Sequence, residues 1–457
     1  MSTVTQSAPR SVVSSLRILG WIAGVVAVLF SLLAIDHALA LAGGRVELQV
    51  RLIAWLTSDT FVFGEGNLRG MEVWYRDALG RMSLHMVLGG IALGLGILQF
   101  VPSLRRRKPR LHRKLGLIIW LATLASMVGA ISFLATFPMH EDASGAAFHL
   151  GLWALALLTL LLLAQAVLAA WSRDFRSHMV WMSTVMAALA TAPMLRLDWV
   201  VFSHLWGGHQ LAVVSLATGT FVLLQTLLLM TIWLTWIGDR DLPARPTPVS
   251  TFPMWLVRLL AVLSALGAVQ EGLLAPLGHD LFASSRDARE LLPPGASLWA
   301  IASVVAMISL PTAWRDALTG AVPSRLISFS SAAVALGALA IGVDHDRGSM
   351  ERFSIAAFWV AYGMALLFAL GLAHLVRPNS AGRNAWSHLL LASLWLPSQL
   401  NGLLLVGVAV GADFSEAMTA ALFNGFGGIA VVGIATGFGA RFRFWPSPGW
   451  RSQAAST

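Results

Sequence analysis

Long apolar runs separated by short polar segments recur along the whole length of the chain. A hydrocarbon core of about 30 Å needs roughly 20 consecutive apolar residues in a helix. Because hydrocarbon offers no water to backbone N–H and C=O groups, runs of this length are expected to be helical. The pattern predicts an all-α polytopic membrane protein with about twelve transmembrane helices. We expect these helices at residues 17–42, 84–104, 114–136, 147–171, 179–197, 210–237, 254–275, 297–314, 325–343, 353–376, 386–411 and 415–440.

The composition agrees with this class. Of 457 residues, 57% are hydrophobic and only 12% are charged, which is not typical of a soluble domain. The first apolar run is too long for a cleaved signal peptide, so we interpret it as a retained helix. The chain has no cysteine, which excludes disulfides, thiolate metal sites and covalent haem attachment through Cys-x-x-Cys-His. A bound metal or haem would have to be held by His, Met, Asp, Glu or Asn.

The basic residues predict the orientation of the chain. If the N-terminus is inside, about two thirds of the 31 Lys and Arg fall on inner segments, the densest run being residues 105–108. The positive-inside rule therefore predicts that both termini are cytoplasmic. The net charge of +9 is explained by this loop bias and by nearby anionic lipid, so we expect no nucleic-acid partner. We expect the protein to be a multipass protein of the bacterial inner membrane, with the lipid bilayer as its main partner.

One segment between the predicted helices is both polar and rich in proline, at residues 240–253. Such a segment favours an extended, solvated linker. It predicts an N-terminal six-helix half, residues 1–239, and a C-terminal six-helix half, residues 254–457. The longest outer loop, residues 43–83, contains two stretches that we interpret as short amphipathic or interfacial pieces.

Each of four successive predicted helices carries a histidine in its first turn: His85, His112, His149 and His178. Because consecutive helices run in opposite directions, His85 and His149 would lie at the outer face and the other two at the inner face. Helices two apart in sequence are commonly neighbours in a small bundle. Each face could then offer two facing imidazoles, which is the ligand set of a bis-histidine b-type haem. The glycines that follow His85 suit either a flat macrocycle or a close helix contact.

Short motifs surround the two inner histidines. They are His112-Arg113-x-x-Gly116 and Arg176-x-His178-x-x-Trp181-Met182. Residues 80–200, approximately, resemble the recurring module of a bacterial multipass membrane family of uncharacterised function, whose signatures are His-Arg-x-x-Gly and Arg-x-His-x-x-Trp-Met. The helix order and the alternating histidines also resemble the four-helix diheme core of cytochrome b561.

The resemblance to cytochrome b561 implies two b-type haems. His85 and His149 would ligate an outer haem, and His112 and His178 an inner one. Arg113 and Arg176 lie beside the inner histidines, where they could receive haem propionates. The function implied is transmembrane electron transfer, with a quinol or a small reductant as partner. Because no flavin- or nucleotide-binding domain is attached, we do not expect a complete NADH reductase, and whether the protein is an enzyme stays open.

Other interpretations of these residues remain open. Interfacial His, Trp and Arg can simply anchor helix ends at the headgroup level, as in a structural or sensory membrane protein. Buried acids in a membrane mark proton or ion routes by default, which favours a cofactor-free transporter. Histidines beside acids in the outer loops have the ligand types of copper or zinc sites, but they lack the close spacing of a metal motif, and solvated loop residues explain them better. The transporter hypothesis concerns five residues: Asp36, His37, Glu271, Asn401 and Asn424. Separately, we expect Arg196 and Asp198 to form a local ion pair or to contact a haem propionate.

Overall fold

The computed structural model describes residues 10–63, 68–137 and 145–205, together with the isolated residues Val222, Gln225, Thr226, Val262, Val269, Ala440, Arg441 and Arg443. Every regular element in these three ranges is a helix. Apart from those isolated residues, the helices predicted from residue 210 onward lie outside the described residues. The same holds for the linker at 240–253 and for Glu271, Asn401 and Asn424.

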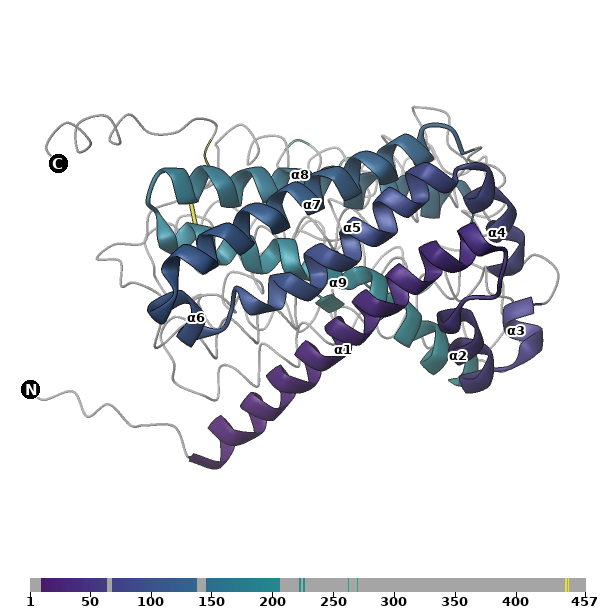
Figure 1. Ribbon diagram of the computed structural model, residues 1–457, viewed down its shortest axis with the longest axis horizontal. Helices are drawn as coiled ribbons and strands as arrows, with labels where there is room; N and C mark the ends of the chain where they lie inside the picture. The colour runs from purple at the N-terminus through teal and green to yellow at the C-terminus, as the bar shows by residue number, and fades with distance from the viewer. Residues whose placement is uncertain are drawn as a thin grey trace, which may run out of the picture. The chain divides into compact units, whose positions relative to one another are not determined.

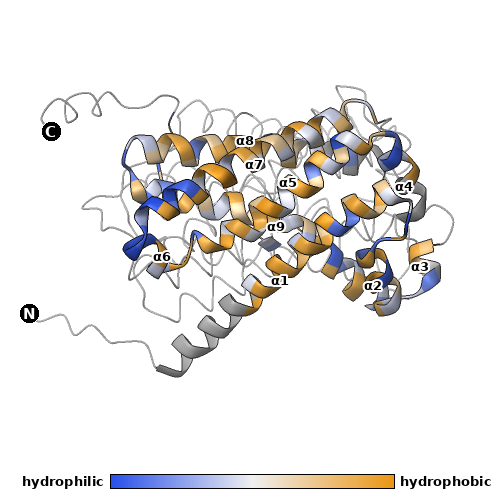
Figure 2. Cartoon of the chain, in the orientation of Figure 1, coloured by the Kyte–Doolittle hydropathy of each residue, from blue (hydrophilic) through white to orange (hydrophobic). Residues whose placement is uncertain are grey.

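Five stretches of the described chain are long and apolar enough to cross a membrane, and they lie within the five longest helices. Figure 2 shows hydrophobic colour along these helices, whereas hydrophilic colour gathers at the short helix α6 and the start of α7. These lengths and compositions confirm the class predicted from the sequence, an integral membrane protein made of helices. The five are α1 (Arg10–Gly43), α5 (Leu79–Leu98), α7 (Pro109–Leu134), α8 (Gly145–Trp171) and α9 (Phe175–Leu205).

The predicted bounds of the second span were wrong at both ends. We expected a helix over 84–104, but α5 runs from Leu79 to Leu98. Arg81 does not interrupt it, because its guanidinium reaches the Ser132 carbonyl oxygen at 3.2 Å. The helix stops before Pro102, since a residue that precedes proline avoids helical geometry, and Val101 is extended. The basic run that follows forms the separate helix α6 (Pro102–Arg107).

The predicted outer loop contains three short helices, α2 (Leu48–Leu56), α3 (Asp59–Phe63) and α4 (Leu68–Asp77). The loop therefore contains helical structure, and the interpretation of its two stretches as short amphipathic or interfacial pieces stays a prediction. Ser58 begins α3 in the manner of an N-cap, because its hydroxyl oxygen accepts the Phe61 N–H at 3.1 Å.

The chain divides into two compact units. The first comprises Met1–Trp55 and Glu72–Phe133, and the second comprises Leu56–Met71 and Leu134–Thr457. In the first unit α1 packs along α5, and in the second α8 packs along α9 (Figure 1). We predicted a different division, into two six-helix halves joined by the linker at residues 240–253. The described contacts do not test that prediction.

Glycines on α5 bring it close to α1. A Cβ added at Gly90 would lie 3.0 Å from the Ser31 carbonyl oxygen, and one at Gly94 would lie 2.9 Å from Ser31 Oγ. Small residues at such crossings allow the backbones of membrane helices to approach. This side of α5 therefore makes a close contact with α1. The sequence had allowed either such a contact or a flat macrocycle beside these glycines.

The end of α1 is held by charged residues. Gly44 has a φ of +65°, and Arg45 N–H reaches the Ala40 carbonyl oxygen at 3.1 Å, as in a Schellman turn. Asp36 forms an ion pair with Arg45, and its second oxygen accepts the Leu48 N–H at 2.9 Å. The hydrogen bond to Asp36 raises the pKa of Arg45. Asp36, which we considered as part of a transport route, thus has a structural role at the end of α1.

Candidate functional site

The four predicted histidines all lie in described helices, at different depths from the helix start. His112 and His178 are the fourth residues of α7 and α9, as the prediction of first-turn positions requires. His149 is the fifth residue of α8. His85 is the seventh residue of α5, so its predicted first-turn position was wrong, because α5 begins five residues before the expected start.

His85 is held by Ser126 of α7 in the first unit. The Ser126 hydroxyl donates to the His85 carbonyl oxygen at 2.8 Å. His85 Nδ1 lies 3.1 Å from both the Ser126 carbonyl oxygen and Ser126 Oγ. Since the hydroxyl proton is directed to the His85 carbonyl, we assign the proton of the imidazole to Nδ1, where it is donated to Ser126. Nε2 is then the ring nitrogen that carries a lone pair.

His178 shows the same arrangement in the second unit. Its Nδ1 lies 2.9 Å from the Ala166 carbonyl oxygen on α8, so Nδ1 again carries the proton and Nε2 the lone pair. Metal-ligating histidines usually donate one ring N–H to a carbonyl or carboxylate, which fixes the tautomer and aims the other nitrogen at the metal. Interhelical hydrogen bonds between neutral side chains and backbone also have this form.

The remaining two histidines are placed differently. His149 is only 3% exposed, and its ring stacks on Phe137 with centroids 6.0 Å apart and planes 25° apart. His112 is half-buried, and its carbonyl oxygen accepts the Gln99 side-chain N–H at 3.3 Å. That bond joins the end of α5 to the start of α7 within the first unit.

Each predicted haem pair takes one histidine from each compact unit. His85 and His112 belong to the first unit, and His149 and His178 to the second. The positions of the two units relative to each other are not determined, so the pairing of the histidines stays a prediction. The roles of Arg113 and Arg176 also stay predictions. Within the described part of the chain, no group of three or more His, Asp or Glu side chains forms a metal site.

The expected ion pair between Arg196 and Asp198 is not formed. Residues two apart on a helix do not face each other. Arg196 donates to the Ala192 carbonyl oxygen at 3.1 Å, and its guanidinium lies 5.1 Å from the ring centroid of Trp199. Asp198 is 5% exposed and accepts the Gln225 side-chain N–H at 3.3 Å.

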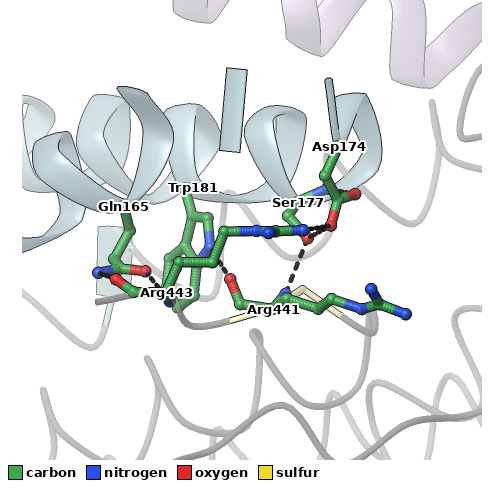
Figure 3. Close-up of polar contacts among 6 residues, drawn as sticks. All are labelled: Gln165, Asp174, Ser177, Trp181, Arg441 and Arg443. Carbon is green, nitrogen blue, oxygen red and sulfur yellow. Dashed lines mark hydrogen bonds and ion pairs between the residues drawn. The ribbon is translucent and has the colours of Figure 1, made fainter. Parts of the chain in front are cut away.

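The structure also contains a polar cluster that the sequence did not suggest, in the second unit (Figure 3). Four side chains of α8, α9 and the turn between them hold two residues near the C-terminus. Their partners are separated by 260 or more positions in the chain, so no local motif connects them. One signal was present, because Trp181 belongs to the Arg-x-His-x-x-Trp-Met signature. The cluster consists of Gln165, Asp174, Ser177 and Trp181, together with Arg441 and Arg443.

The turn that joins α8 to α9 positions this cluster. Arg173 adopts a φ of 56°, and Asp174 N–H reaches the Ala169 carbonyl oxygen at 2.9 Å, which is the pattern of a Schellman turn with a non-glycine residue at its left-handed position. Asp174 then caps α9, since its Oδ1 accepts the Ser177 N–H at 3.2 Å. The carboxylate is thereby held at a defined place beside Ser177.

Part of this chain matches the model of a protein family. No curated protein and no solved structure matches this chain. The resemblance to cytochrome b561 is not shown by these comparisons and stays a prediction. The predicted likeness to a multipass membrane family is confirmed for about a third of the chain, because residues 82–234 match the model of a family described as "Predicted membrane protein (DUF2306)".

Proposed function

We propose that this integral membrane protein binds two b-type haems and transfers electrons between the two faces of the membrane. In this proposal His85 and His149 hold the outer haem, and His112 and His178 hold the inner one. A bound haem supplies a one-electron redox centre, and the residues of the chain hold it, orient it and shield it from water. Quinol or a small reductant is the proposed electron donor.

The anchoring of His85 and His178 carries the proposal. Both imidazoles donate Nδ1–H to an oxygen of the adjacent helix, at 3.1 and 2.9 Å. In this tautomer Nε2 is the ring nitrogen whose lone pair would ligate an iron, and the hydrogen bond from Nδ1 to the adjacent helix orients the ring. Iron ligation requires the neutral form of both imidazoles.

Charge supports the assignment of the inner haem. Arg113 follows His112 directly, and Arg176 lies two residues before His178. Guanidinium groups bind carboxylates through paired N–H donors, so these residues suit the two propionates of a haem. The family match covers all four histidines, and the description of that family as a predicted membrane protein supports the membrane setting.

The absorbance spectrum of the detergent-solubilised protein tests this proposal. After expression with added haem precursor and reduction by dithionite, we expect a Soret band and an α-band, with two haems for each chain. His85→Ala is expected to remove one haem and leave one, and His178→Ala to remove the other, because each substitution deletes a different axial ligand.

His204→Ala is the matched control for these variants. His204 is exposed near the end of α9, where its Nε2 lies 2.6 Å from the Leu56 carbonyl oxygen, and it belongs to neither proposed pair. Its replacement should leave both haems in place. A colourless wild-type protein, or loss of the same amount of haem from all three variants, would contradict the proposal.

A cofactor-free transporter is the second candidate, and Asp198 is the observation that favours it. This carboxyl is 5% exposed in a candidate span, and its Oδ2 accepts no hydrogen bond within the described part of the chain. Intramembrane acids of this kind commonly carry protons or bind ions. A wild-type protein that stays colourless after expression with excess haem would favour this candidate over electron transfer.

A further inference from the structure

The polar cluster of the second unit binds the backbone of a peptide segment. Arg441 N–H donates to Ser177 Oγ at 2.8 Å, and the Arg441 carbonyl oxygen accepts the indole N–H of Trp181 at 3.0 Å. Both main-chain groups of one residue are thus satisfied by side chains of α9. Ser177 can accept this bond because its own proton is donated to Asp174 Oδ2 at 2.8 Å.

Arg443 is held in the same way by one amide side chain of α8. Arg443 N–H donates to Gln165 Oε1 at 2.7 Å, and the Arg443 carbonyl oxygen accepts from Gln165 Nε2 at 2.9 Å. In an extended chain, the N–H and C=O groups of residues i and i+2 point to the same side. The four bonds therefore fit the hydrogen-bonding edge of an extended segment, and Figure 3 shows their side-chain partners along one side of Arg441 and Arg443.

One side chain of the segment is recognised as well. Arg443 Nη2 lies 3.3 Å from Asp174 Oδ2, and the two side chains are only 14% and 11% exposed. Water therefore screens this ion pair less than it screens one on the surface. Ala440 is fully buried, which favours a small residue at that position.

The residues that make these contacts are buried. Gln165 is 3% exposed, Trp181 is 1% exposed and Ser177 is fully buried. A buried amide, hydroxyl and indole are costly unless each one is hydrogen-bonded. Occupancy by an extended segment satisfies all three at once, which gives the arrangement the character of a binding site.

We infer that Gln165, Asp174, Ser177 and Trp181 form a peptide-binding site, here called the clasp, whose ligand is an extended segment with the pattern Ala-Arg-x-Arg. Residues 440–443 of the same chain occupy the clasp. Of the five contacts between described residues, four are to backbone, so they select an extended conformation, and Asp174 selects arginine at the last position. The clasp lies within the family match at 82–234, whereas its ligand lies outside it. The clasp therefore fastens the C-terminal part of the chain to the family-matching part, whether or not haem is bound.

Proteolysis of the full-length protein in detergent tests whether the segment is clasped. Trypsin must bind backbone in an extended form to cleave after Arg441 or Arg443, so occupancy of the clasp protects both bonds. Gln165→Ala removes two hydrogen bonds, and we expect cleavage at these sites to become about tenfold faster or more. Asp174→Asn keeps the helix cap, since Asn caps as well as Asp does, and is expected to give a smaller increase, of about two- to fivefold.

Thr159→Ala is the control for these variants. Thr159 is 2% exposed on the same helix, and its hydroxyl bonds only to the Leu155 carbonyl oxygen of that helix among the contacts described. Cleavage after Arg451 serves as the internal reference for protease activity. Equal relative rates at Arg441 and Arg443 in wild type, Gln165→Ala and Thr159→Ala would overturn the inference.

Binding of a separate peptide tests the ligand class. Arg443→Glu in the full-length protein places a second acid beside Asp174 and should release the segment from the clasp. A fluorescent peptide with the sequence of residues 437–447 is then expected to bind this variant at least tenfold more tightly than wild type, in which the clasp is occupied. The double variant with Gln165→Ala should lose this binding.

Two outcomes of the peptide experiment overturn the inference. One is absence of binding to an Arg443→Glu protein that elutes from a sizing column as the wild type does. The other is equal binding by the double variant, or by a peptide whose arginine at position 443 is replaced by Glu, since either would show attachment elsewhere. If Arg443→Glu does not elute as wild type, Arg443→Ala takes its place, since it also removes the ion pair and leaves all four residues of the clasp unchanged.

Discussion

Gly129→Ala is expected to destabilise the first unit by about 1–3 kcal/mol, because the new methyl group would collide with backbone. A Cβ at this position of α7 would lie 2.7 Å from the Arg81 carbonyl oxygen and 3.0 Å from the His85 backbone nitrogen. Backbone of α5 cannot move aside as a flexible side chain can, so the two helices must separate. Separation would also break the bonds between His85 and Ser126. The measurement is the fraction of protein that stays monodisperse after heating in detergent.

Gly80→Ala is the matched control for this prediction. Gly80 lies in the first turn of α5, and a Cβ there would meet nothing within 4 Å. Because alanine favours a helix over glycine by about 1 kcal/mol, this variant should be as stable as wild type or slightly more so. If the same fraction of both alanine variants stays monodisperse after heating, α5 and α7 do not pack closely at Gly129.

The reason for this sensitivity lies in the solvent. Between helices in lipid there is little hydrophobic driving force, so association depends on close van der Waals packing and interhelical hydrogen bonds. At Gly129 both are present, since Ser126 on the same helix bonds to His85. A glycine on α7 therefore also sets the geometry of a proposed haem ligand on α5.

Trp181→Ala is expected to have the largest effect in the second unit. Trp181 is among the largest fully buried side chains in the described part of the chain, with 1% exposure. Removing it leaves a cavity and an unsatisfied carbonyl at Arg441, and such truncations cost about 3–5 kcal/mol in protein cores. We expect a loss of about 3 kcal/mol in detergent, measured by the same heating assay, together with faster tryptic cleavage after Arg441.

Two variants separate packing from hydrogen bonding at this position. Trp181→Phe keeps most of the buried ring but removes the indole N–H, so it should cost about 1 kcal/mol and still accelerate the cleavage. Trp171→Ala removes a tryptophan that is 63% exposed at the end of α8, and should change stability by less than about 0.5 kcal/mol. A Trp181→Ala protein that resists heat as well as Trp171→Ala does would show that Trp181 is not part of a packed core.

The sequence predicted helix positions better than helix ends. The apolar runs located all five long helices, since the length of an apolar run is a local property that the bilayer selects. The bounds of α5 were wrong because Arg81 can remain helical when a carbonyl on another helix receives its guanidinium. Hydropathy alone contains no information about such a partner.

The candidate site was predicted in part. The sequence identified His85 and His178 as unusual, and the structure shows each bonded through Nδ1 to a neighbouring helix, α7 for His85 and α8 for His178. It did not predict the partners, because Ser126 and Ala166 have no feature in the sequence that singles them out. The clasp was missed entirely, since Gln165 and Asp174 acquire their role only from residues more than 260 positions away.

By itself, the sequence determined that this is a helical membrane protein without thiol chemistry, because apolar run length and the absence of cysteine need no partner to be interpreted. The tertiary structure alone decided that Gly90 and Gly94 admit α1, that Asp36 closes a helix end, and that Trp181 holds a distant backbone carbonyl. The physical reason is that glycine, carboxylate and indole each suit several contacts. Which contact forms depends on the element that packing brings within about 3 Å.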